Sequence, residues 1–293
     1  MKKSITDQTY YGLVYFITIM AVIVTLYPFL YVLSVSLSSV NAIDKQLVIL
    51  FPVEFTLSGY KMVLQYPEIW TSYYNTIWYT VVGTALNIFA TCLAAFPLSR
   101  TRFFLRRKLN FFIAFTMYFS GGLIPVYILI TSLGLYNTRW VMVLPVLVMT
   151  FNVMICRSAF ESIPNEVFES ASMDGANDIT MLFRIAVPIV KPTLAVLTLY
   201  YAVFHWNNFF SALLYLGDHS LQPLQIFLRR VLIMASPEIM QKMGGGTATS
   251  QLAVSSLQVR YVSIVVSILP IIMIYPFIQR YFVKGITLGA VKG

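Results

Sequence analysis

The sequence predicts an all-α integral membrane protein with six transmembrane helices. Of its 293 residues, 58% are hydrophobic and only 11% are charged, whereas an ordinary soluble domain has about 25% charged residues. The apolar residues lie in long continuous runs rather than in alternating segments of about ten residues, which favours helices over a membrane β-barrel. Because lipid offers the backbone no hydrogen-bond partners, each run of about 20 apolar residues is expected to cross the bilayer as a helix.

The apolar windows give the predicted order of the spans. The first run follows Lys2 and Lys3 and is longer than the core of a secretory signal, about 7–15 residues, so we predict an uncleaved first span. Residues 1–70 would then hold this span and a long extracytoplasmic loop, residues 71–280 the other five spans, and residues 281–293 a cytoplasmic tail. The predicted spans are residues 11–37, 73–98, 109–133, 140–156, 193–215 and 257–278.

Residues 161–192 are too charged to form a seventh span. Each charge near the membrane centre costs about 2.5–3.5 kcal/mol, so insertion of this segment would cost about 20 kcal/mol. We therefore predict that the segment stays in water or at the membrane interface. Its charged residues are Glu161, Glu166, Glu169, Asp174, Asp178, Arg184 and Lys191.

Lysine and arginine predict the orientation of the chain, because basic residues are concentrated in cytoplasmic loops. With the N-terminus in the cytoplasm, most of the 20 basic residues face inward. The strongest single indication is the short basic loop at residues 99–108, "SRTRFFLRRK", between the second and third spans. Both termini and residues 161–192 are therefore predicted to be cytoplasmic, and residues 38–71 and 216–256 to be extracytoplasmic.

Several functions are excluded by what the sequence lacks. The formal charge of +9 is spread over span ends rather than gathered in a stripe, so nucleic-acid binding is not expected. Cys92 and Cys156 both fall in apolar runs, which indicates small core residues rather than a disulfide or a metal site. There is no phosphate-binding G-x-x-x-x-G-K-[ST] motif, so nucleotide hydrolysis would belong to another polypeptide. The spans contain almost no ionisable residues, which argues against a self-contained secondary transporter.

The acidic segment has the pattern of two short helices joined at a glycine. Pro164 suits the first turn of a helix, and Gly175 can take the left-handed conformation that ends one. Asn177 or Asp178 can cap the second helix. Such a helix could dock into a groove on a soluble partner or could simply plug the bundle, and the pattern alone does not choose between them.

The same stretch resembles a known motif. "ESASMDGA" at residues 169–176, followed by Phe183, Ile185, Pro188 and Pro192, is similar to the EAA motif of ABC importer permeases, with Ser170 in place of the first alanine. The six spans, the long first extracytoplasmic loop and the ending "FVKGITLGAVKG" resemble the carbohydrate-uptake permeases of this family, including the maltose-transporter permease without extra N-terminal spans.

The resemblance implies a fold, a set of partners and a location. The fold would be that of type I ABC importer permeases, with a cytoplasmic coupling helix between spans four and five. The chain would be a non-catalytic subunit without a cofactor, and ATP and Mg would be bound by a cytoplasmic ATPase dimer. The other partners would be a second homologous permease, an extracytoplasmic solute-binding protein, the oligosaccharide and the lipid of a bacterial cytoplasmic (inner) membrane. The coupling residues would be Glu169, Ala171, Asp174, Gly175, Ala176, Ile185 and Pro188.

A run of aromatic and polar residues in the fifth span is the main candidate for the substrate path. Its members would face the bundle interior, because they are costly to expose to lipid, and they could bind sugar or join this span to the partner permease. Ser120, Gly121 and Gly122 are a second candidate, where a helix could break beside the cavity. The candidates in the fifth span are Tyr201, His205, Trp206, Asn207 and Asn208.

Two further expectations concern the substrate. Gly244, Gly245 and Gly246 lie in the loop before the last span and could probe the binding protein, or could form a surface turn. An oligosaccharide is the expected substrate, and one that contains uronates is the more specific expectation. The alternatives are an ABC importer permease for another solute, such as a polyamine or phosphate, and a secondary transporter.

Overall fold

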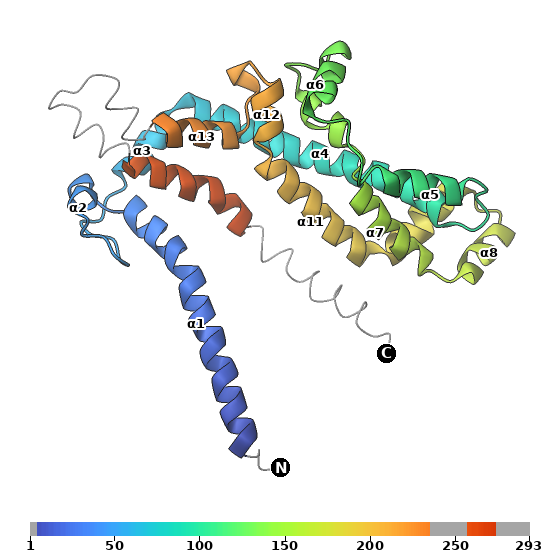
Figure 1. The fold of residues 1–293 in the computed structure, drawn as a ribbon, viewed down its shortest axis with the longest axis horizontal. Helices are drawn as coiled ribbons and strands as arrows, with labels where there is room; N and C mark the ends of the chain where they lie inside the picture. The colour runs from blue at the N-terminus through green and yellow to red at the C-terminus, as the bar shows by residue number, and fades with distance from the viewer. Residues whose placement is uncertain (1–4, 235–256, 274–293) are drawn as a thin grey trace. The chain divides into compact units, whose positions relative to one another are not determined.

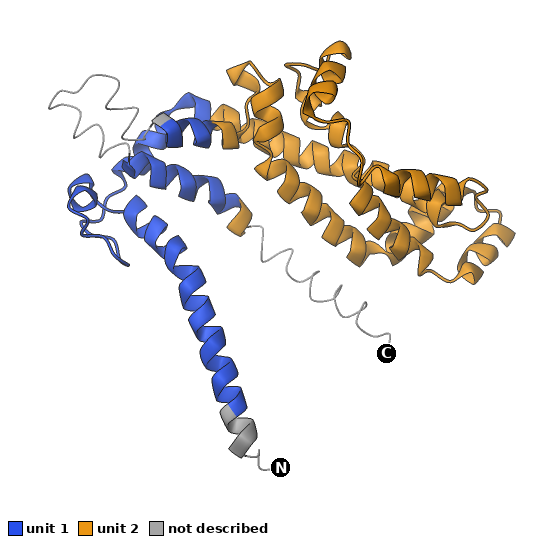
Figure 2. Ribbon diagram, in the orientation of Figure 1, with its two compact units in different colours: residues 1–69, 227–270 blue, residues 70–226, 271–293 orange. Residues whose placement is uncertain are grey.

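The computed structural model describes residues 5–234 and 257–273, and within these ranges every regular element is helical (Figure 1). The predicted all-α class is thereby confirmed. The chain divides into two compact units, one of residues 1–69 and 227–270 and the other of residues 70–226 and 271–293 (Figure 2).

The first unit contains the longest exposed apolar helix. Helix α1 (Ile5–Ser36) includes the stretch Tyr10–Ser36, which has a mean hydropathy of 2.3, and none of its most apolar window is buried within the chain. A bare apolar surface of this length is the surface that a bilayer covers. The predicted first span, residues 11–37, ends one residue beyond α1.

Small elements pack together beyond the C-terminal end of α1 in the first unit. The predicted topology places this end outside the cytoplasm. They are α2 (Val40–Asp44), α3 (Ser58–Gln65) and the helix Leu257–Met273. The Gln258 side chain donates to the backbone carbonyl of Ser38 at 2.9 Å. This bond joins segments that lie far apart in the sequence.

Helix α4 (Pro67–Ser99) is the axis of the second unit. It has 33 residues, which makes it about 50 Å long at 1.5 Å per residue, and it contains the predicted second span, residues 73–98. One apolar cluster packs at its C-terminal part around Phe96. A second cluster packs at its N-terminal part around Tyr79. The helix therefore links two separate packing centres that lie about 25 Å apart along its axis.

The predicted third span, residues 109–133, is divided in two. Helix α5 (Arg106–Phe115) ends before the glycines, and α6 (Leu123–Ser132) begins after them. Gly122 has a φ of 85°, which is incompatible with a right-handed helix, and glycine is in any case a weak helix former. A break at this place was one of the sequence-based expectations.

The predicted fourth span, residues 140–156, contains two short 3₁₀ turns and then a helix. The turns are η1 (Arg139–Met142) and η2 (Leu144–Val146), and α7 (Thr150–Glu161) follows after a bend of 52°. Pro145 lies inside η2, just before the bend, and has no N–H to donate. The carbonyls of Val146 and Leu147 accept bonds from the Asn87 side chain at 2.6 and 2.8 Å, so the break leaves them satisfied.

The predicted fifth span, residues 193–215, is also divided. Helix α11 (Lys191–Asn207) ends at the asparagines and α12 (Phe210–Tyr215) follows. The last predicted span, residues 257–278, coincides with the helix Leu257–Met273 over the residues that the structure describes.

Two of the described helices, the stretch Tyr10–Ser36 of α1 and α4, are long and apolar enough to cross a membrane. Up to four spans result if each of two bent helix pairs is one span. The count of six remains a prediction.

Helix α11 packs against α4 so closely that only a glycine fits at one point. A Cβ atom added to Gly83 would lie 2.5 Å from Nε2 of His205 and 2.7 Å from its Cε1. The imidazole could move only by giving up its bond to Asn87.

Replacing Gly83 with alanine is expected to destabilise the protein by about 1–3 kcal/mol, because it overpacks the contact between α4 and α11. The measurement is the thermal unfolding midpoint of the purified protein. The matched control is Gly12→Ala in α1, where an added Cβ meets nothing within 4 Å. Equal midpoints for the two variants would show that this contact is not tight.

Candidate functional site

The segment of residues 161–192 folds as a short helix, a turn and a second, bent helix. The first helix is α8 (Asn165–Met173). The second comprises α9 (Asp178–Thr180), a π-helical stretch η3 (Met181–Ala186) and α10 (Val187–Ile189), and it meets α11 at an angle of 87°. This agrees with the predicted pair of helices.

Gly175 makes the turn between the two helices. Its φ is 79°, and its N–H donates to the carbonyl of Ser172 at 3.0 Å, while the N–H of Ala176 donates to the carbonyl of Ala171 at 2.9 Å. These two bonds form a Schellman motif, which favours glycine at this position. Asn177 then caps the next helix by accepting from the N–H of Thr180 at 2.8 Å. Both sequence-based expectations for this turn are confirmed.

Helix α8 has one buried and one exposed face. Phe168 and Ala171 are buried in the apolar cluster around the end of α4. Asp174 at the end of the helix is exposed, Met173 keeps 89% of its surface in solvent, and Glu169 is exposed where α8 borders a pocket beside α4. The helix is therefore held by its own chain from one side and is open to a partner on the other.

Arg100 fastens α8 to the end of α4. Its guanidinium lies 4.0 Å from the centre of the Phe168 ring, it donates to the backbone carbonyl of Phe160 at the end of α7, and its Nε donates to Ser99 Oγ at 3.0 Å. Burial lowers the pKa of Arg100 from its ordinary value, and the nearby Glu161 carboxylate opposes this shift. One side chain thus joins α4, α7 and α8.

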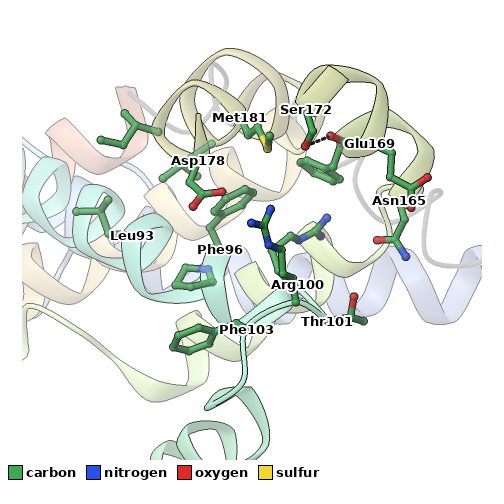
Figure 3. A pocket seen from close by; sticks show the side chains of 15 residues that line it. Leu93, Phe96, Arg100, Thr101, Phe103, Asn165, Glu169, Ser172, Asp178 and Met181 are labelled. Atoms are coloured by element: carbon green, nitrogen blue, oxygen red, sulfur yellow. Dashed lines mark hydrogen bonds between the residues drawn. The ribbon is translucent and has the colours of Figure 1, made fainter. Parts of the chain in front are cut away.

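A pocket of about 580 Å³ lies between the end of α4 and the segment of residues 161–192 (Figure 3). Arg100, Glu169 and Asp178 supply charge at its wall, and Phe96 and Met181 supply apolar surface. The described ranges contain no cluster of three or more His, Cys, Asp or Glu side chains that could hold a metal ion. The arrangement suits a protein contact, because it combines an apolar floor with charges of both signs.

The predicted coupling residues fall into two groups. Glu169, Asp174 and Gly175 lie on the exposed side of the turn, and Pro188 is exposed at the base of the second helix. The other three face the chain itself. Ala171 is buried in the cluster around α4, and Ala176 and Ile185 pack against that cluster.

Tyr201 and His205 are both engaged inside the chain. The Tyr201 hydroxyl lies 2.7 Å from Thr91 Oγ1, and Nε2 of His205 lies 2.6 Å from Asn87 Oδ1. Both side chains are almost completely buried. These two contacts join α11 to α4 within this chain. Neither sequence-based alternative, a sugar site or a contact with the partner permease, included such a role.

The partners Asn87 and Thr91 were missed by the sequence analysis, although a signal was present. They lie four residues apart on α4, and Tyr201 and His205 lie four residues apart on α11, so each pair occupies one face of its helix. Two polar pairs with matching spacing in apolar helices could have been aligned.

The break between α11 and α12 holds two buried hydrogen-bond donors. Nε1 of Trp206 and Nδ2 of Asn208 are buried and have no partner among the described residues. Asn208 also accepts from the N–H of Ser211 at 3.2 Å, and Asn207 is exposed and donates to the Val203 carbonyl at 3.0 Å. Gly244, Gly245, Gly246 and the predicted tail of residues 281–293 lie outside the described residues.

Comparison with known proteins decides the family. Over residues 87–288 the chain matches the family described as binding-protein-dependent transport system inner membrane component. The chain belongs to this family. The permease is 37% identical, over the full length of both chains, to the polygalacturonan/rhamnogalacturonan transport system permease protein YtcP of Bacillus subtilis. It is 40% identical to protein LplC of the same organism over 92% of the permease and 90% of LplC.

A solved structure agrees with this assignment. The permease superposes with a TM-score of 0.87 and 33% identity on a chain from a bacterial ABC transporter involved in the import of the acidic polysaccharide alginate. The match covers 96% of the permease and 99% of that chain. The predicted resemblance to ABC importer permeases of the sugar-uptake type is confirmed.

Proposed function

We propose that the permease is one transmembrane subunit of an ATP-driven importer of oligosaccharides, and that residues 161–192 couple it to a cytoplasmic ATPase dimer, which binds ATP and Mg. A second homologous permease would complete the translocation path, and an extracytoplasmic solute-binding protein would deliver the sugar. The family description, which includes dependence on a binding protein, supports the last partner. Both termini would lie in the cytoplasm, as the distribution of basic residues indicates.

The observation that carries this proposal is the two-sided character of α8. Its exposed residues include two carboxylates, Glu169 at the pocket and Asp174 at the helix end, and a methionine, Met173, a residue type common at adaptable protein contacts. Its inner side is clamped to α4 through Phe168 and Arg100. Closure of an ATPase dimer that grips the outer side would therefore move α4 as well.

The sugar is proposed to be acidic. YtcP is named for polygalacturonan and rhamnogalacturonan, and the superposed transporter for alginate, and these polymers contain uronates. The buried donors of Trp206 and Asn208 at the break between α11 and α12 would have acceptors if sugar hydroxyls passed there. An unsatisfied buried donor costs about 1–3 kcal/mol, so a bound ligand would recover stabilisation.

The test is to purify the permease with its co-assembling subunits and to measure ATP hydrolysis with the binding protein and a series of glycans. Acidic oligosaccharides are expected to stimulate hydrolysis, and neutral oligosaccharides to do so less. Stimulation by a polyamine or phosphate instead of any glycan would favour an importer for another solute. Failure of an ATPase to co-purify in any mild detergent would refute the coupling proposal.

Reversing the charge of Glu169 is expected to weaken the ATPase contact. Glu169→Lys should lower the amount of co-purified ATPase and the sugar-stimulated rate by about fivefold or more, because the docking side of α8 loses a carboxylate and gains a cation. Asp44→Lys is the matched control, since it reverses an exposed charge at the end of α2. Equal retention of ATPase by both variants would argue against docking through α8.

A further inference from the structure

Arg139 has no carboxylate partner among residues 5–234 and 257–273, and its neighbours are largely aromatic. Its Nη2 donates to Asn75 Oδ1 at 3.1 Å, and its guanidinium lies 5.2 Å from the centre of the Tyr74 ring and 5.7 Å from that of Trp78. None of the ion pairs in the described part of the chain involves it. A half-buried cation with no counterion is a group to which an anionic ligand can bind with charge-assisted hydrogen bonds.

The guanidinium is held in place before any ligand arrives. Asn75 is itself completely buried, and its Nδ2 donates to the carbonyls of Ser220 and Gln222 at 2.7 and 3.2 Å. The guanidinium also lies beside the Tyr74 and Trp78 rings. A pre-ordered arginine loses little freedom on binding, and its planar fork matches the two oxygens of a carboxylate.

Exposed aromatic surface surrounds this cation. Tyr74 is 57% exposed and Trp140 is 46% exposed, and the Trp140 ring packs edge to face against Trp78 at 5.7 Å. Ring faces are suited to the apolar face of a pyranose, while the neighbouring polar group fixes its orientation.

The position of Arg139 and its neighbouring aromatic rings along α4 fits a site at which the sugar enters the permease. Trp78 and Arg100 lie 22 residues apart, which corresponds to about 33 Å of helix, close to the thickness of the hydrocarbon core. If the Arg100 end faces the cytoplasmic ATPase, the Arg139 end faces the side on which the binding protein delivers its sugar.

From these observations we infer that Arg139, with Tyr74 and Trp140, forms a subsite that binds the carboxylate and ring of a uronate residue as an acidic oligosaccharide enters the permease. This inference rests on the proposed function and adds to it a residue that distinguishes acidic from neutral sugars.

The experiment measures direct binding of an oligogalacturonate to the purified transporter complex without the binding protein. The reference ligand is the same oligosaccharide with its carboxyl groups reduced to alcohols, which keeps the rings and removes the charge. Arg139→Gln is expected to raise the dissociation constant of the acidic ligand about tenfold or more and to leave that of the reduced ligand unchanged. Arg139→Lys, which keeps the charge without the fork, should give a smaller rise, also confined to the acidic ligand.

Other outcomes would overturn the inference. An equal loss of affinity for the acidic and the reduced ligand would show that Arg139 has a structural role. No loss of affinity for either ligand would exclude the subsite. Arg230→Gln removes a cation that is paired with Glu68 in the other unit. If this variant raises the dissociation constant of the acidic ligand by the same factor, the effect of Arg139→Gln would reflect only the net charge of the protein. Weaker binding of the sugar-free binding protein in Arg139→Gln would assign the surface to that protein instead.

Failure of the proposed function is a separate result. In that case no oligosaccharide would stimulate ATP hydrolysis by the wild-type complex with its binding protein. If stimulation is found and Arg139→Gln still binds the acidic ligand normally, only the subsite is refuted. If Arg139→Gln does not assemble, the binding measured with Arg139→Lys decides, because that variant keeps the charge at this position.

Discussion

Replacing Gly175 with proline is expected to uncouple sugar delivery from ATP hydrolysis while the transmembrane helices stay folded. Proline requires a φ near −65° and has no N–H, whereas Gly175 has a φ of 79° and donates to the Ser172 carbonyl. The variant must therefore change the direction in which the chain leaves α8. The sugar-stimulated part of the ATPase rate should fall about tenfold or more, within the usual range of coupling energies.

The chain contains a matched control for this variant. Gly134 follows α6 with a φ of 70°, and its N–H donates to the Thr131 carbonyl at 3.0 Å, while that of Leu135 donates to Ile130 at 3.2 Å. Gly134→Pro thus breaks the same motif away from residues 161–192. It is expected to lose a similar amount of thermal stability but to keep its co-purifying ATPase, of which Gly175→Pro should retain less. Normal stimulation in Gly175→Pro would contradict the docking role of this turn.

Replacing Arg100 with alanine is expected to have the second large effect. The change removes the guanidinium from the Phe168 ring and leaves the Phe160 carbonyl without this donor. Together these losses should cost about 2–4 kcal/mol of stability. Because Arg100 joins α8 to α4, stimulated ATP hydrolysis should also fall while basal hydrolysis by the attached ATPase persists.

Arg102 provides the comparison for Arg100. It lies two residues further on, also borders the pocket and is exposed, so Arg102→Ala removes the same charge without removing the link between helices. We expect its thermal midpoint to remain close to the wild-type value, whereas that of Arg100→Ala should fall. The thermal stability of Arg100→Lys should lie between those of the wild type and Arg100→Ala, since lysine keeps the charge but has no planar group to stack on the Phe168 ring. Equal thermal midpoints for Arg100→Ala and Arg102→Ala would show that Arg100 acts only as a surface charge and does not link the helices.

The local features of residues 161–192 could be predicted because their signals are local. A glycine that follows an acidic helix indicates a left-handed turn, and an asparagine two residues later indicates a cap. The structure has both, at Gly175 and Asn177. Nothing local, however, reveals that Ala171 is buried while Glu169 is exposed, because this depends on where α4 lies.

The breaks in the helices were harder to predict. Hydropathy averages over about 20 residues and does not detect a single glycine or proline inside an apolar window. It therefore merged α5 with α6 and α11 with α12. Gly122 is visible as a break in the sequence, but the break at Val146 and Leu147 depends on Asn87, which lies about 60 residues away and satisfies their carbonyls.

The class of the protein, its apolar helices and the motif that resembles the EAA motif are predictable from the sequence, since composition, hydropathy and short-range spacing are properties of neighbouring residues. Which polar residues face one another follows instead from the packing of the folded chain. The sequence makes Tyr201 and His205 candidates for binding sugar or for joining the partner permease, and in the folded chain they meet Thr91 and Asn87. Arg100 belongs to the basic loop that indicates the orientation of the chain, but in the folded chain it holds α8 against α4. Arg139 lies beside aromatic rings. The physical reason is that a buried polar group must find its partner in space, and that partner is often far away in the chain.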